Sequence, residues 1–315
     1  MFLTLFVEFH SLPPPSCQRV IPLFPEFKPL EPADRMAVEA VVHTFPPYSE
    51  FSFTNLYAWN AQISCLHGNL AVRLTDYVSG APFFTFIGRH RLAETAMQLL
   101  ALSRAQGHSA ALRLVPESAA QELAEGGFEL TADDAATDYV FAVEHIAGMH
   151  EWAGHSVRRR IRQFAARHPA YSVRHAPLHD IDADEFRALF ALWAARKGYA
   201  SPQTSREFPA FERFLRSADP NVETVGLYVD ARLVGFSSFE LMPGGTAIVH
   251  FSKTDNSFHG GVCNVLFWEE AKLLQARSVT HYNWGADLGL PGLRLSKKKY
   301  KPCQFLKAFT VRTAD

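Results

Sequence analysis

The order of elements between residues 223 and 284 constrains the fold more than any other feature of this sequence. Strand-like segments come in quick succession there: ETVGLYVD, RLVGFSSFELM and GTAIVHFSKTD. The first two are joined at Asp230 and Ala231, and the last two by the Pro-Gly-Gly at 243–245, which is hairpin chemistry. A loop with paired glycines then opens a long amphipathic helix, and a further strand, VTHYNWG, follows. This order predicts an α+β unit with a mixed, largely antiparallel sheet rather than a doubly wound parallel one.

The rest of the chain also mixes helical and strand-like segments. In the first half, helices are predicted at ADRMAVEAVVHTF, RLAETAMQLLALSRAQG and ESAAQELAEGG, and strands at ISCLHGNLAVRLT, APFFTFIG, AALRLV and TDYVFAV. The second half has an arginine-rich helix, EWAGHSVRRRIRQFAARHP, two more helices, DADEFRALFALWAARKG and SREFPAFERFLRSA, and a last strand, CQFLKAFTVR. We therefore expect a tail over residues 1–24 and two halves, 25–150 and 151–315, with the functional cleft mainly in the second.

Composition narrows the class of protein. The 315 residues are enough for two domains with a substantial core each, and 48% hydrophobic with 20% charged residues is typical of a globular protein. The N-terminal apolar run has about nine residues, against the roughly 20 that a spanning helix needs, so no membrane span is predicted. The four cysteines form no CxxC, so neither a disulfide framework nor a metal site is predicted, and a cytoplasmic setting is favoured.

Charge is segregated along the chain, although the formal net charge is only −1. Residues 154–174 contain six arginines and no acid, and residues 287–312 contain seven Lys/Arg and one acid, Asp287. Each segment is therefore about +6, and the remainder of the chain is acidic. Blocks of this kind favour a phosphate-bearing partner, with a solvated cationic face as the alternative.

Several residues could hold an anion. Gly260 and Gly261 precede a helix, whose N-terminal N–H groups form an anion site when glycine allows close approach; a simple turn is the alternative. Arg294 and Lys297 are three residues apart, so in a helix they share a face and could clamp a phosphate, unless they belong to a cationic surface. Lys253 directly follows a strand and could reach the same anion.

The sequence lacks the signatures of metal-dependent and covalent catalysis, since it contains no GxSxG, no HExxH and no Cys/His pairing. Transfer from an ester or thioester to an amine needs none of these. It needs an anchored donor, stabilisation of the carbonyl oxyanion and removal of a proton from the nucleophile. Asp287, in the turn GADLG, could orient an incoming amine or relay its proton, with an Asx-turn as the alternative.

A family resemblance rests on motifs in both halves. Antiparallel strands, a glycine loop into a helix and further strands are the order of the GNAT acyltransferase fold. The elements HFSKTD, Gly261 and Asn264, YNWGADLG and GLRLSKKKYKP resemble the C-terminal catalytic region of phosphatidylglycerol lysyltransferases and their soluble relatives. FPPYSEFSFTNLYAW, DYVF at 138–141 and the arginine helix agree, so the resemblance covers residues 25–312. Its most specific part is the spaced LRxxKxxYxP element, residues 293–302.

The resemblance implies a fold and a set of site residues. The family is similar to Fem-type transferases, which have two GNAT-like halves in tandem and move an aminoacyl group from aminoacyl-tRNA to an amine or a lipid hydroxyl. His250 is then on the strand that lines the carrier cleft, where an ordinary pKa near 6.5 suits a proton acceptor; a core histidine is the alternative. The implied donor-binding residues are Lys253, Gly260, Gly261, Asn264, Arg294, Lys297 and Tyr300, with Arg158, Arg159 and Arg162 on the arginine helix.

Two functions of different class are compatible with these features. The first is an acyltransferase or aminoacyltransferase with catalytic residues Asp287 and His250, no tightly bound cofactor, and aminoacyl-tRNA or acyl-CoA as donor. Its acceptor is a small molecule, a peptide or a lipid. The second is a non-catalytic GNAT-like module that uses the basic segments to bind RNA or a protein. The resemblance favours the enzyme, and the two separated basic segments favour tRNA over coenzyme A as the larger ligand.

Overall fold

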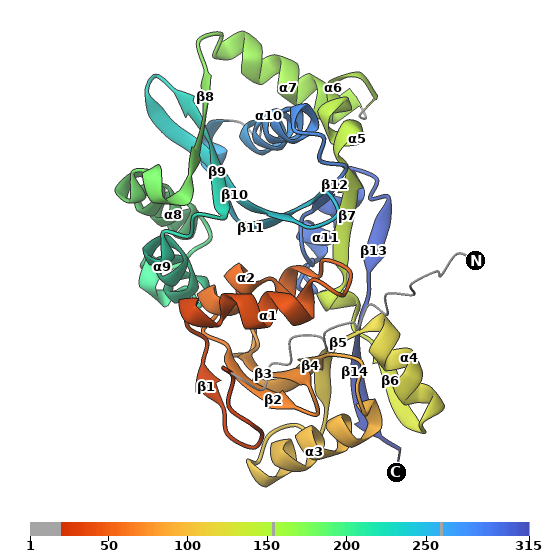
Figure 1. Ribbon diagram of the computed structural model, residues 1–315. Helices are drawn as coiled ribbons and strands as arrows, with labels where there is room; N and C mark the ends of the chain where they lie inside the picture. The colour runs from red at the N-terminus through yellow and green to blue at the C-terminus, as the bar shows by residue number, and fades with distance from the viewer. Residues whose placement is uncertain (1–19, 153–154, 259–260, 315) are drawn as a thin grey trace, which may run out of the picture.

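The computed structural model describes residues 20–152, 155–258 and 261–314, which form two seven-stranded mixed sheets (Figure 1). The predicted tail up to residue 19 and Gly260 lie outside the described residues. The first half of the fold lies below the second in the view of Figure 1. Helices α1 and α2 of the first half face the second half, where α2 packs against α9.

The first sheet has the strand order β1-β2-β3-β4-β5-β14-β6, and the only parallel pair within it is β4 and β5. Helices α3 and α4 cover one face and α1 and α2 the other. The bounds of these elements are β1 Lys28–Pro29, α1 Arg35–Val42, α2 Phe53–Ala58, β2 Gln62–Leu66, β3 Asn69–Thr75, β4 Pro82–Ile87, α3 Leu92–Ala105, β5 Leu112–Pro116, α4 Glu117–Glu125, β6 Phe128–Ala132 and β14 Ala308–Thr313.

The second sheet has the order β13-β7-β12-β11-β10-β9-β8, and only β11 and β12 run parallel. Helices α5, α7 and α10 cover one face and α8 and α9 the other. The bounds are β7 Asp138–Ala142, α5 Val143–Ala147, α6 Met149–Trp152, α7 His155–Arg167, β8 Ser172–Pro177, α8 Ala183–Arg196, α9 Glu207–Ser217, β9 Val222–Val229, β10 Arg232–Met242, β11 Thr246–Thr254, α10 Val262–Ala276, β12 His281–Asn283, α11 Pro291–Lys298 and β13 Gln304–Leu306.

The turns between β9, β10 and β11 show why this region folds as two hairpins. Asp230 and Ala231 have φ values of 50° and 62°, and Gly244 and Gly245 have φ values of 84° and 77°. Left-handed residues of this kind match the twist of paired antiparallel strands. Helix α10 then begins at Val262, directly after the glycine loop. The α+β class with largely antiparallel sheets, predicted from the sequence, is confirmed.

The two sheets exchange strands across the sequence. Strand β7 precedes residue 150 but lies in the second sheet, between β12 and β13, whereas β14 ends the chain inside the first sheet, between β5 and β6. The sequence suggested a boundary between two halves at residue 150, and this boundary stays a proposal. Each sheet contains one or more strands from the other side of residue 150. The exchange ties the halves together at the turn that follows β12.

Two further sequence-based expectations concerned disulfides and membrane-spanning helices. Cys65 is disulfide-bonded, whereas Cys263 and Cys303 are free thiols. The sequence predicted no disulfide framework and gave no indication of the bond at Cys65, because spacing along a sequence does not show which sulfur atoms approach each other. Within the described ranges, no helix has both the length and the apolar character to cross a bilayer.

Candidate active site

The candidate site lies where β11 and β12 diverge. The two strands pair in parallel only from Thr246 to Ile248, opposite His281 to Asn283. Beyond this point β11 continues along β10, whereas the chain after β12 turns away at Trp284. Three predicted site residues lie on the two segments that separate here, because His250 and Lys253 are on β11 and the turn with Asp287 follows β12.

His250 occupies a β-bulge. Phe251 pairs with Ser238 and Val249 pairs with Phe239, so His250 is the extra residue of β11. A bulge of this kind re-aims a side chain. Here the imidazole is 1% exposed, and its Nε2 lies 3.2 Å from Oε2 of Glu240.

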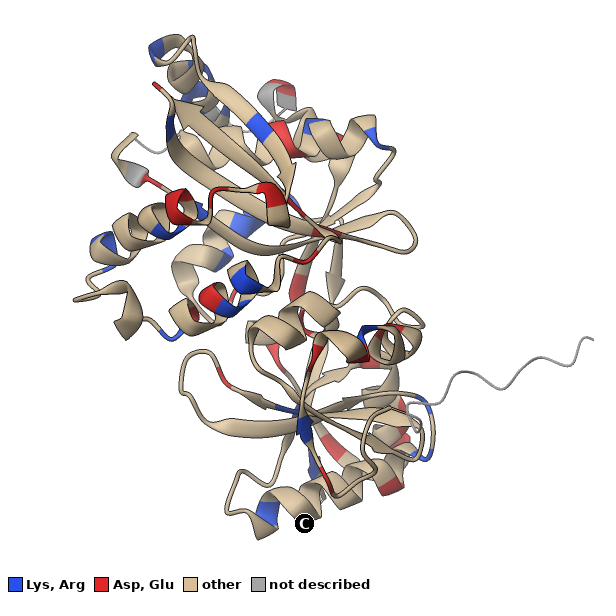
Figure 2. Ribbon diagram, turned by 60° about the vertical axis from the view of Figure 1, so that its left-hand side comes forward, with Lys and Arg blue, Asp and Glu red and all other residues tan. Residues whose placement is uncertain are grey.

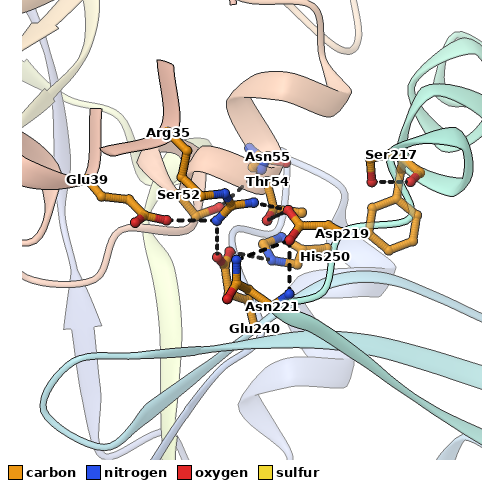
Figure 3. Close-up of polar contacts among 11 residues, drawn as sticks. Arg35, Glu39, Ser52, Thr54, Asn55, Ser217, Asp219, Asn221, Glu240 and His250 are labelled. Carbon is orange, nitrogen blue, oxygen red and sulfur yellow. Dashed lines mark hydrogen bonds and ion pairs between the residues drawn. The ribbon is translucent and has the colours of Figure 1, made fainter. Parts of the chain in front are cut away.

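Glu240 connects His250 to the first half of the fold (Figure 3). Its Oε1 accepts a hydrogen bond of 3.2 Å from Nη1 of Arg35, on α1. Arg35 also contacts Glu39, at 2.7 Å, and Asp219. Burial alone raises the pKa of Glu240, but His250 and Arg35 outweigh it and hold that pKa below its ordinary value. The imidazole is therefore held by an ionised network that spans both halves.

Asp287 is fully buried and accepts four hydrogen bonds from three residues. Arg294 donates from Nε at 2.7 Å and from Nη2 at 3.1 Å, the Tyr139 hydroxyl at 2.7 Å and the Gly289 N–H at 2.9 Å. Burial raises the pKa of Asp287, but Arg294 and Tyr139 lower it below the ordinary value. Asp287 and Arg294 thus form an ion pair that closes the turn after β12. The hydrogen bond from the Gly289 N–H forms the Asx-turn that was the alternative to a catalytic role for Asp287. That catalytic role and a phosphate contact for Arg294 stay predictions.

Lys297 stabilises the same turn. Its Nζ donates to the carbonyl oxygens of Trp284, Gly285 and Ala286 at 2.6, 2.8 and 2.7 Å. Burial lowers the pKa of Lys297 to about 8. Arg294 and Lys297 share a face of α11 as the spacing predicted, but that face points to the protein. Phosphate binding by Lys297 stays a prediction.

Lys253 contacts an acid and an aromatic ring, and Gly261 allows two helices to pack closely. The Lys253 ammonium lies 2.7 Å from Oε1 of Glu207 and 4.5 Å from the centre of the Trp193 ring, on the α8 and α9 side of the sheet. A Cβ at Gly261 would lie 2.9 Å from Cβ of Phe164 and 3.1 Å from the Arg160 carbonyl oxygen. The glycine therefore lets α7 pack against the first turn of α10.

Asn264 and Tyr300 form a buried pair beneath that turn. Nδ2 of Asn264 lies 2.5 Å from the Tyr300 hydroxyl, and burial raises the pKa of Tyr300. The Tyr300 ring lies 5.0 Å from Trp284, which stacks on Phe267 at 4.4 Å. This aromatic cluster fills the space between α10 and the turn after β12.

The arginines of α7 face solvent. Val157, Ile161 and Phe164 are buried against the core, as the apolar stripe predicted. Arg159 and Arg162 are exposed, Arg158 is half-buried, and these three line a groove of about 380 Å³. Figure 2 shows the Lys and Arg positions of α7 in blue at the top of the molecule. No ion pair joins them to a carboxylate in the part of the chain that the structure describes. Arg158 donates to the Glu151 backbone carbonyl at 3.3 Å, so Arg159 and Arg162 are the more open members of this group.

Residues outside the predicted set also shape the site. Arg35, Asp219 and Glu240 surround His250, and Tyr139 supports Asp287. One signal was available: Glu240 is the lone acid of a largely apolar strand, where a buried charge requires a partner. Arg35 and Asp219 are separated by 184 residues and gave no such signal.

The family follows from a comparison of sequences. The profile of the family described as phosphatidylglycerol lysyltransferase, C-terminal, matches residues 43–312. The chain belongs to this family. No curated protein sequence matches it.

Solved structures support the fold of this family member. A conserved protein of unknown function from Bacteroides thetaiotaomicron is 20% identical, with a TM-score of 0.76 over 94% of this chain and 100% of that one. L-PGS from Bacillus licheniformis is 13% identical, with a TM-score of 0.57 over 83% and 86%. FemX is 13% identical, with a TM-score of 0.51 over 90% and 96%. Together with the strand order, these likenesses identify two tandem GNAT-like halves.

Proposed function

We propose that this member of the phosphatidylglycerol lysyltransferase C-terminal family transfers an aminoacyl group from aminoacyl-tRNA to an amine or hydroxyl acceptor. The family and the tandem GNAT-like halves support group transfer from an activated donor. The observation that carries the choice of donor is the exposed arginine face of α7. Another side of the same helix packs against the first turn of α10 at Gly261.

The contrast between the arginines along α7 and the cations bonded within the site favours tRNA over coenzyme A. A compact pyrophosphate pocket requires cations at the β11–β12 divergence, but Arg294, Lys297 and Lys253 all have protein acceptors there. The α7 arginines instead extend along an exposed helix, which suits the spaced phosphates of a nucleic acid. Acyl-CoA is the second candidate donor, because a helix N-terminus next to glycine also suits a pyrophosphate.

The chemical step is assigned to residues near the divergence. His250 accepts the proton of the attacking amine, and Glu240 orients its imidazole through the 3.2 Å contact. The Asp287–Arg294 pair keeps the turn after β12 in place beside the acyl group. Attack forms the new C–N or C–O bond and breaks the ester bond to tRNA, whose ribose oxygen takes up a proton as it leaves.

Replacing Arg158, Arg159 and Arg162 together with Ala is expected to weaken tRNA binding about tenfold or more at moderate salt. If the three side chains contact phosphates, the slope of log K against log salt should fall by about 2 to 3. Fluorescence anisotropy with labelled tRNA at several salt concentrations measures both quantities.

A matched control removes the same charge elsewhere. Arg89, Arg104 and Arg312 are exposed residues of the first half of the fold, and α3 and β14, which contain Arg104 and Arg312, belong to the half away from α7 (Figure 1). Their triple Ala variant should bind tRNA with nearly the wild-type salt slope. Wild-type binding by the α7 variant, or equal losses in both variants, would contradict the donor assignment. Binding of aminoacyl-tRNA without single-turnover transfer to any amine or hydroxyl acceptor would favour the non-catalytic module.

A further inference from the structure

A small cavity lies in the first half, next to the turn that follows β12. Its volume is about 60 Å³, room for about four or five non-hydrogen atoms. Its walls are mostly apolar and include Leu74, Phe83, Leu114 and Leu288. Leu288 is adjacent to Asp287 in sequence, so the cavity borders the candidate active site without including its predicted residues. Glu50 and Tyr77 supply polar groups.

Glu50 is a half-buried acid whose hydrogen-bond donors are neutral. Its Oε2 accepts hydrogen bonds from the Tyr77 hydroxyl and from Nδ2 of Asn55, the latter at 3.2 Å. No ion pair involves Glu50 among the residues that the structure describes. Burial raises the pKa of Glu50 to about 7, because its donors do not compensate for the loss of water.

The nearby cations already have partners. Nη1 of Arg113 lies 2.6 Å from Asp76 and its Nη2 3.5 Å from Asp133, while its guanidinium lies 4.9 Å from the centre of the Phe83 ring. Lys297 donates to three carbonyl groups. The cavity therefore combines apolar walls with an excess of negative charge.

The backbone around the cavity is strained at two leucines. Leu114 and Leu288 both have φ values of 55°, in the left-handed region that bulky residues rarely adopt. Two such residues on one cavity wall indicate that the shape of the wall is maintained at a cost in stability. Strain of this kind concentrates at functional sites.

We propose that this cavity binds an organic ammonium group on a short apolar stem, with the cation against Glu50 and the stem against Leu74, Phe83, Leu114 and Leu288. A bound cation supplies the positive partner that the half-buried carboxylate does not have among the described residues, and the apolar walls limit water around the contact. The role of this ammonium rests on the proposed function. It belongs either to the acceptor amine or to the α-ammonium of the aminoacyl donor.

Propylamine, propanol and propionate test the binding step without any donor. These probes have similar size and differ in charge. Calorimetric or NMR titration should show propylamine binding at least about tenfold more tightly than the other two. Glu50→Gln keeps the size of the side chain and should weaken propylamine binding about 10- to 100-fold. Glu129→Gln, at an exposed position of β6, removes the same charge and should bind propylamine like the wild type.

The pH dependence gives a second readout in the folded wild type. Propylamine stays protonated at pH 6 and pH 8, whereas Glu50, with a pKa of about 7, is mostly protonated at pH 6 and mostly ionised at pH 8. Binding should therefore be about tenfold tighter at pH 8. Other groups that act on Glu50 are Asp138, which raises its pKa, and Tyr77 and Arg113, which lower it. Lys297, with a pKa of about 8, loses part of its charge over the same range and favours the same direction.

Tyr77→Phe separates the Glu50 titration from other effects, because loss of the Tyr77 donor should move the pH midpoint of binding upward. Equal binding of propanol and propylamine, equal binding at pH 6 and pH 8, or wild-type propylamine affinity in Glu50→Gln would overturn the proposal. These outcomes leave tRNA binding by α7 untouched, so they are distinct from a failure of the proposed function.

Transfer assays identify the source of the ammonium. If Glu50→Gln raises KM for the amine acceptor and leaves the Kd for aminoacyl-tRNA unchanged, the cavity holds the acceptor. If the Kd for aminoacyl-tRNA rises about tenfold and the Kd for deacylated tRNA does not, the cavity holds the α-ammonium of the donor. If neither quantity changes, the cavity has no part in transfer and the proposal is overturned.

Discussion

Lys297→Met is expected to lower the free energy of unfolding by about 3–5 kcal/mol. The Lys297 ammonium is buried and donates to three successive carbonyl groups, those of Trp284, Gly285 and Ala286. Methionine has similar length and fills the same space, but it has no donor. The substitution leaves three buried acceptors without this partner, and each such loss costs about 1–3 kcal/mol. Urea unfolding of the two proteins at pH 7 measures the difference.

Lys298→Met is the matched control, because Lys298 is the next residue of α11 and is exposed. Its free energy of unfolding should stay within about 0.5 kcal/mol of wild type. A stable Lys297→Met variant that binds aminoacyl-tRNA or coenzyme A poorly would show that Lys297 acts on the donor's phosphates. That result would support the phosphate contact that the spacing of Arg294 and Lys297 suggested.

Local chemistry explains what the sequence predicted correctly. The hairpin turns require left-handed residues, and Asp230, Ala231, Gly244 and Gly245 adopt them. The arginine helix has an apolar stripe, and Val157, Ile161 and Phe164 bury it. Both features depend on residues within a few positions of each other, so turn preference and helical period are sufficient to find them.

The strand exchange was beyond prediction because partners in a sheet are chosen by long-range packing. The segment TDYVFAV reads as a buried strand, and nothing within it indicates that β7 lies between β12 and β13. The same holds for β14, which pairs with β5 and β6 nearly 200 residues earlier in the chain. Domain bounds drawn by sequence order therefore separate segments that the fold brings together.

The candidate site shows the same limit at the level of side chains. A cationic segment has the same sequence pattern whether its side chains face solvent or the core. In residues 294–301, Lys298 and Lys299 are exposed, while Lys297 is buried. The distinction depends on three carbonyl groups whose direction is set by the turn after β12. The network around His250 likewise joins residues from α1, β10 and the segment before β9.

Glu270→Gln is expected to raise the free energy of unfolding by about 3 kcal/mol at pH 8. Glu270 lies on α10, is completely buried, and neither carboxyl oxygen has a hydrogen-bond partner of normal geometry among the described residues. The hydroxyl groups of Ser237 and Tyr282 are near enough to lower its pKa, but burial dominates and raises that pKa from 4.5 to about 7. A shift of this size corresponds to about 3 kcal/mol.

The sign of the pH dependence follows from the raised pKa in the folded state. Near pH 4 the carboxyl is largely protonated in both the folded and unfolded chains, so its ionisation costs the fold almost nothing. Between pH 4.5 and 7 the unfolded chain releases this proton first, and the stability of the wild type falls relative to the variant. Above pH 7 the full difference in the free energy of unfolding between the wild type and Glu270→Gln is present. Glutamine has the same shape and no charge to desolvate, so its advantage should grow with pH and reach a plateau.

Urea unfolding at pH 4, 6 and 8 measures this difference, with Glu269→Gln as the control on the same helix. Glu269 contacts the Tyr171 hydroxyl at 2.8 Å and Lys272 at 2.6 Å, so loss of its charge should give no gain that increases with pH. An equal gain for Glu270→Gln at all three pH values would point to better packing rather than ionisation. A loss at pH 8 would mean that the Glu270 carboxylate is ionised in the fold and stabilised by Ser237 and Tyr282. The α10 helix would then carry a buried charge directly behind the aromatic cluster of Trp284, and the turn after β12 would be expected to lose order in the variant.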